Sequence, residues 1–176
     1  MIHLKQRLLI ILPLILLIIM PGCSVAKTKT EAPSSIISGF SCDITLSYSD
    51  MSISAHMTWP SAGVCCIEIK EPASLSGMTL NWSGGEFSLS YMGIEVPFSE
   101  EILPNAGFAE GIVNSLEAAV QETEFEIIKS GNEYIYSAIG KSGDYSLSFD
   151  ENSGNLTGIS VPSINLDAVI SNFETM

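Results

Sequence analysis

The stretch FSCDITLSYSDMSISAHMTW, from Phe40 to Trp59, decides the fold of this chain. Apolar and polar residues alternate along it on both sides of Ser49-Asp50, a pair typical of a turn. The apolar set is Phe40, Cys42, Ile44, Leu46, Tyr48, Met51, Ile53, Ala55, Met57 and Trp59. Strict alternation over this length predicts two half-buried antiparallel strands joined as a hairpin.

The same two-residue alternation continues towards the C-terminus as far as Phe98. Further strands are predicted at 64–70, 78–82, 87–91 and 94–98, with turns at 60–63 and 83–85 and a break at Gly93. The period then changes once. Phe108, Ile112, Leu116 and Val120 recur every four residues, which predicts one amphipathic helix over about 106–121 with Asn105 as its N-cap.

Alternation returns after the helix and predicts five more strands. They cover about 124–129, 133–139, 144–149, 156–161 and 166–173. Only one face of each strand is apolar, so the sheet has one covered face and one solvated face. The pattern therefore predicts a mainly β (α+β) fold of about ten or eleven short antiparallel strands, with one central helix covering the apolar face.

The N-terminal region indicates export. Lys5 and Arg7 precede an apolar run of thirteen residues, Leu8 to Met20, which has the layout of a signal peptide and is short for a spanning helix. The run ends in Met20-Pro21-Gly22-Cys23, which resembles the lipobox of bacterial lipoproteins. The resemblance implies cleavage after Gly22 and acylation of Cys23. The alternatives are an uncleaved short anchor, or a secreted protein with an incidental cysteine.

This gives three segments: a lipoprotein signal peptide over 1–22, a lipidated cysteine with a flexible tether over 23–38, and a single β-rich domain over 39–176. The mature chain would keep five lysines against twenty acidic residues, a net charge of −15, which excludes nucleic acid as a partner. Cys42, Cys65 and Cys66 are expected to be free thiols, with a Cys42–Cys65 bridge as the alternative.

No motif predicts an enzyme, a cofactor or a metal site. Gly140-Lys141-Ser142 lacks the glycine that a phosphate-binding loop needs at position 135, which is Ile135. The segment 150–154 departs from a calcium loop at its fifth and twelfth positions. His56 falls on the polar side of its strand, so we expect a surface histidine without a catalytic role.

One set of residues suggests a binding surface. The apolar face gathers methionine and aromatic side chains, which form adaptable linings for greasy ligands. The candidate lining is Met51, Met57, Trp59, Met78, Trp82, Phe87 and Tyr91, and the candidate lid is the helix face of Phe108, Ile112, Leu116 and Val120. The alternative is an ordinary packed core.

The order of these features resembles the LolA/LolB-like lipoprotein-carrier superfamily and the LppX-like lipid-binding lipoproteins. The likeness rests on P-x-x-L-x-G-M-T-L from Pro72, G-x-F-x-L-x-Y-x-G from Gly85, and S-N-F at Ser171. It implies an antiparallel half-barrel whose concave apolar face is closed by helices and holds acyl chains.

The resulting expectation is an envelope lipoprotein. It would be anchored through Cys23 on the extracytoplasmic face of a bacterial cell membrane and would bind a hydrophobic or lipid-like ligand. The alternative is a non-enzymatic module with a dry core that binds another envelope protein.

Overall fold

The computed structural model of the protein describes residues 28–29, 33–98, 107–122 and 124–176. Its elements are β1 (Thr28–Lys29), α2 (Ser34–Ile37), β2 (Phe40–Tyr48), β3 (Met51–Ser61), β4 (Val64–Glu71), β5 (Thr79–Ser83), β6 (Glu86–Tyr91), β7 (Ile94–Phe98), α3 (Gly107–Gln121), β8 (Glu124–Ser130), β9 (Glu133–Gly140), β10 (Gly143–Asp150), β11 (Leu156–Val161), the 3-10 turn η2 (Pro162–Ile164) and β12 (Leu166–Thr175).

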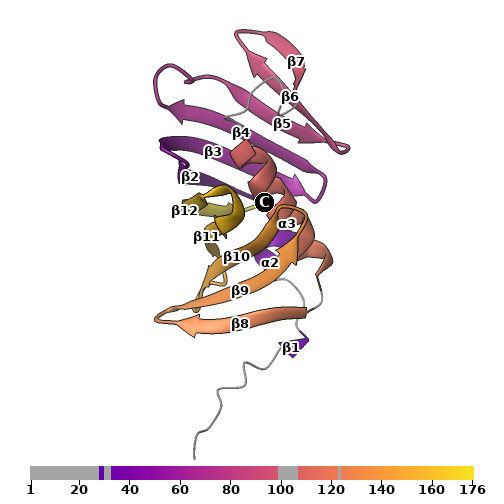
Figure 1. Ribbon diagram of the computed structural model, residues 1–176, viewed down its shortest axis with the longest axis vertical. Helices are drawn as coiled ribbons and strands as arrows, with labels where there is room; N and C mark the ends of the chain where they lie inside the picture. The colour runs from indigo at the N-terminus through magenta and orange to yellow at the C-terminus, as the bar shows by residue number, and fades with distance from the viewer. Residues whose placement is uncertain (1–27, 30–32, 99–106, 123) are drawn as a thin grey trace, which may run out of the picture.

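All the strands belong to one antiparallel sheet. The order across it is β1-β8-β9-β10-β11-β12-β2-β3-β4-β5-β6-β7, so β12 joins the C-terminal meander to the N-terminal one through β2. The sheet curves around α3 without closing, and β7 and β1 lie at its opposite ends (Figure 1). This confirms the predicted curved half-barrel with one central helix, and the strands from β2 onward match the predicted number.

The opening hairpin forms the middle of the core. Its register pairs Phe40 with Trp59 and Cys42 with Met57. These side chains are fully buried, whereas the alternate residues on the same strands lie on the outer face. The apolar residues of the alternating pattern therefore form the buried concave face of the sheet, and the polar residues form its solvated convex face.

Helix α3 covers part of the concave face. Its residues Phe108, Ile112 and Leu116 are buried between the helix and the sheet, and its residue Val120 is half-buried. The Phe108 ring lies 6.0 Å from the Tyr48 ring on β2, centroid to centroid. The predicted apolar stripe of the helix therefore does face the sheet.

The N-terminal boundary of the domain differs from the prediction. The expected flexible tether reaches residue 38, yet Ser34–Ile37 form α2 and Ile36 is fully buried in the core. Trp59 Nε1 donates a hydrogen bond to the Ile36 carbonyl oxygen at 3.2 Å, and Ser35 Oγ donates to the Gly154 carbonyl oxygen at 2.8 Å. The domain therefore includes α2, because a buried apolar side chain and two hydrogen bonds offset the cost of ordering it.

Several predictions fall outside the described residues. These are the signal peptide, Cys23, residues 24–27 and 30–32 of the tether, and the N-cap Asn105. None of the helices in the described ranges has the length and apolar character needed to cross a bilayer.

Candidate functional site

The seven candidate lining residues do not share one environment. Met57 and Trp59 are fully buried in the core, and Met51 and Met78 are half-buried against it. Trp82 and Phe87 are half-buried at the β5–β7 end of the sheet, and Tyr91 is exposed there. The structure therefore assigns one part of the set to the packed interior and brings the other part together at one end.

The concave face of β5–β7 carries a continuous apolar strip, which we call the open strip: Trp82, Phe87, Leu89, Tyr91, Ile94 and Val96. The strip is built from cross-strand pairs. Trp82 faces Phe87 with ring centroids 4.6 Å apart, and Leu89 and Tyr91 face Val96 and Ile94. Direct cross-strand neighbours have Cβ atoms about 4.5–5.5 Å apart, so these side chains form one surface.

The open strip is less covered than the rest of the concave face. Leu89 is 9% exposed and still belongs to the core, but Tyr91 is 36%, Val96 40% and Ile94 68% exposed. Burial therefore falls steadily towards the β6–β7 turn. Leu89, Ile94 and Val96 were not among the predicted lining residues, although the alternation that predicted β6 and β7 places them on the same face.

A hydrogen bond connects the open strip to the helix. Trp82 Nε1 donates to Glu117 Oε1 at 2.7 Å. Because Glu117 lies on α3, this bond marks the line where the helix-covered part of the concave face ends and the open strip begins. It also gives the half-buried indole the partner that it needs.

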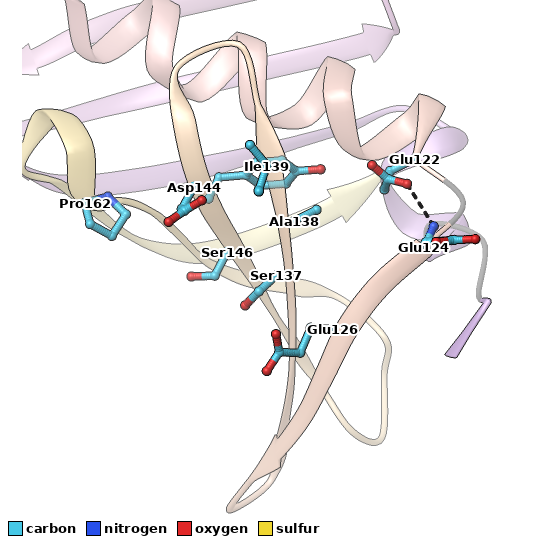
Figure 2. Close-up of a pocket in the computed structure, with 10 residues that line it drawn as sticks. Glu122, Glu124, Glu126, Ser137, Ala138, Ile139, Asp144, Ser146 and Pro162 are labelled. Atoms are coloured by element: carbon cyan, nitrogen blue, oxygen red, sulfur yellow. Dashed lines mark hydrogen bonds between the residues drawn. The ribbon is translucent and has the colours of Figure 1, made fainter. Parts of the chain in front are cut away.

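A second concave region lies on the outer face of β8–β10. It is a groove of about 560 Å³ whose wall includes Glu122, Glu124, Glu126 and Asp144 (Figure 2). The Glu124 backbone N–H donates to Glu122 Oε1 at 2.9 Å. Among the described residues, no three Asp, Glu, His or Cys side chains gather as a metal site. We therefore assign no ligand to this acidic groove.

The only histidine after the predicted signal pairs with an acid on the outer face. His56 Nδ1 lies 2.9 Å from Asp43 Oδ1, and Asn172 Nδ2 donates to Asp43 Oδ2 at 2.8 Å. The Asn172 bond, and then the His56 bond, lower the pKa of Asp43. Among the hydrogen bonds of the described residues, none joins His56 to a serine, threonine or cysteine, so the geometry is that of a surface pair.

The three cysteines of the domain are free thiols, as predicted. Burial raises the pKa of Cys42 to about 12, and burial also raises the pKa values of Cys65 and Cys66. A thiol with a raised pKa is protonated at neutral pH and is a poor nucleophile. These side chains therefore act as small apolar groups, two of them within the core.

Comparison with known proteins gives likenesses of fold. No protein-family model matches the sequence, and no curated protein matches it. Among solved structures, the chain is similar to an uncharacterised conserved protein from Thermus thermophilus, with 9% identity, a TM-score of 0.49, and coverage of 82% of this chain and 83% of that one.

Two further solved structures are similar to the chain in fold. A LolA superfamily protein from Nitrosomonas europaea is 10% identical, with a TM-score of 0.40 and coverage of 84% of this chain and 94% of that one. A putative outer membrane lipoprotein-sorting protein domain from Vibrio parahaemolyticus is 6% identical, with a TM-score of 0.37 and coverage of 77% and 84%. At these identities each is a likeness of fold alone.

Proposed function

We propose that this chain is a cell-envelope lipoprotein that binds a hydrophobic or lipid-like ligand along the open strip. The observation that supports this most directly is the exposure of a row of paired apolar side chains on the concave face of β5–β7. A soluble domain rarely leaves such a row uncovered unless it meets an apolar partner. The curved sheet gives the row a concave setting, as binding sites for small molecules usually have.

The charge of the surrounding chain limits the ligand. No lysine or arginine occurs between residues 71 and 128, a range that contains the open strip and all of α3. The carboxylate that bonds Trp82 at the edge of the open strip is that of Glu117, and it disfavours an anionic headgroup at that point. The ligand we propose is an apolar molecule with a neutral or cationic polar end.

The membrane location belongs to the same proposal. The basic residues, the short apolar run and the Gly22-Cys23 junction support acylation of Cys23 and an extracytoplasmic position on a bacterial cell membrane. The proposal gives the chain no enzymatic role and requires no cofactor.

A matched pair of variants tests ligand binding. Val96→Glu places a charge within the open strip, whereas Val169→Glu places one at a 67% exposed valine on the outer face of β12. Residues 24–176 would be titrated with 1-N-phenylnaphthylamine, a neutral apolar dye, and extracts of the purified protein would be examined by mass spectrometry. We expect Val96→Glu to weaken dye binding by about tenfold or more, and Val169→Glu to leave it unchanged.

The second candidate function is a protein-interaction module with a dry core. The complete burial of Met57 and Trp59 favours it, because these predicted lining residues belong to the core cluster and present no surface to solvent. The ligand-binding proposal would be contradicted if the wild-type protein bound no dye and its extracts contained no apolar molecule. The interaction module would then be the function that fits the structure.

A further inference from the structure

The turn between β6 and β7 holds an apolar side chain in a backbone conformation that disfavours it. Tyr91 pairs with Ile94, so the loop consists of Met92 and Gly93, with φ values of 51° and 80°. Two-residue hairpin loops in which both residues have positive φ prefer Asn-Gly or Asp-Gly. The other three described non-glycine residues with positive φ are Ser49, Asn165 and Asn172, so Met92 is the only apolar one.

Packing does not explain Met92 either. Its side chain is 83% exposed, and it lies outside the core cluster. The adjacent Ile94 and Tyr91 are also exposed, so residues 91–94 form what we call the apolar tip. A residue that is unfavourable for its backbone and unburied in the free protein points to a role outside the fold.

The charge around the apolar tip indicates what it meets. The β6–β7 hairpin, residues 86–98, contains no lysine or arginine, and its two acidic residues, Glu86 and Glu95, are exposed. This charge opposes contact with an anionic lipid surface and favours a partner that carries lysine or arginine around its contact site. The apolar tip is also at the opposite end of the sheet from β1, the end towards the predicted anchor (Figure 1).

We propose that the apolar tip inserts into an apolar recess of a partner protein, and that basic residues line the rim of this recess. The contact uses side chains, not an added strand, because Pro97 takes a backbone donor away from the edge strand β7. This goes beyond ligand binding, which uses the concave open strip and does not need Met92.

Photocrosslinking identifies the partner. The full chain, with p-benzoylphenylalanine in place of Met92, would be made in its own organism, and adducts would be mapped by mass spectrometry. We expect one protein, crosslinked at apolar residues bordered by lysine or arginine. The same probe placed at Asn132, in the polar turn between β8 and β9, is the control and should not give this adduct.

The purified partner then allows a quantitative test. Met92→Asn suits the turn and removes the apolar side chain, so it should keep or raise the thermal stability while it weakens partner binding by about tenfold or more. Ser49→Asn makes a matched change at another positive-φ position, in the turn between β2 and β3, and should leave the affinity unchanged. Wild-type binding should weaken as salt is added.

Three outcomes would overturn the proposal: adducts with lipid alone, adducts only with another copy of this chain, or unchanged affinity of Met92→Asn for the crosslinked partner. Each of the two proposals can be contradicted without contradicting the other. Met92→Asn should retain dye binding, and Val96→Glu should retain partner binding.

Discussion

Trp59 and Trp82 each donate an indole hydrogen bond to a helix that lies on the sheet. Trp59 Nε1 binds the Ile36 carbonyl oxygen of α2, and Trp82 Nε1 binds Glu117 Oε1 of α3. The two residues differ in depth, because Trp59 is fully buried and Trp82 is half-buried beside the open strip. Trp59 therefore belongs to the core, and Trp82 belongs to the candidate site.

This difference predicts two separate phenotypes. Trp59→Ala should lower the free energy of unfolding by about 3–5 kcal/mol, the usual cost of deleting a buried large aromatic side chain. Trp82→Ala should cost less than about 3 kcal/mol, because part of that side chain is already in water. Trp82→Ala should also weaken dye binding. Urea denaturation and dye titration of both variants would check this, and equal destabilisation with unchanged dye binding would contradict it.

The two tryptophans also show what the sequence pattern can predict about a single residue. Alternation correctly placed both tryptophans on the apolar face, because the period of a strand fixes the side to which each residue points. It could not give their depth, which depends on the segments that cover each strand. For Trp59 that segment is α2, which comes from a stretch whose composition predicts a tether.

At the scale of elements, α2 holds the N-terminal segment against the sheet. It contains four residues, too few for a helical period to show in the sequence, and it begins after Pro33. Ile36 and Ile37 are neighbours of the same type, yet Ile36 is fully buried and Ile37 is 52% exposed. The strands β2–β12 and α3 could be predicted because each extends over several periods of its hydrophobic pattern. The four-residue α2 and the two-residue β1 are too short to show a period.

The two isoleucines provide a test of α2 with a built-in control. Ile36→Ala should lower the free energy of unfolding by about 2–5 kcal/mol, because it removes a buried side chain from the core. Ile37→Ala should change it by no more than about 0.5 kcal/mol, as is usual for surface substitutions. Urea denaturation of both proteins measures the difference. Equal, small effects would show that residues 34–37 form a tether after all.

At the scale of the whole molecule, one helix cannot cover the concave face. The fifteen residues of α3 span about 22 Å. Eleven strands, β2–β12, at about 4.8 Å each make a sheet roughly 50 Å wide. Helix α3 packs against β9 and β11 and reaches β5 through the Trp82–Glu117 bond, and α2 packs against β3. The exposed apolar side chains of the concave face therefore gather at β6 and β7. The predicted number of strands and the predicted length of the helix already imply this shortage of cover, but its position depends on which strands the two helices pack against.

The open strip and β1 lie at opposite ends of the sheet. Cys23 precedes Thr28 by five residues, which span at most about 18 Å. Thr28 pairs with Phe125 on β8. If Cys23 is acylated as we propose, the β8 end stays close to the bilayer, and β7 can extend away from it towards a partner.

The anchor itself is testable at this scale. Cys23→Ala removes the proposed site of acylation and should leave the folded domain unchanged, because Cys23 precedes the first residue of α2, Ser34, by eleven residues. The variant should remain an unprocessed precursor or be released into the medium, since a strongly acidic domain has little affinity of its own for an anionic bilayer. Metabolic labelling with an alkyne fatty acid, followed by fractionation, measures both acylation and location. Unlabelled wild type, or a processed variant that stays in the membrane, would show that another segment holds the protein there.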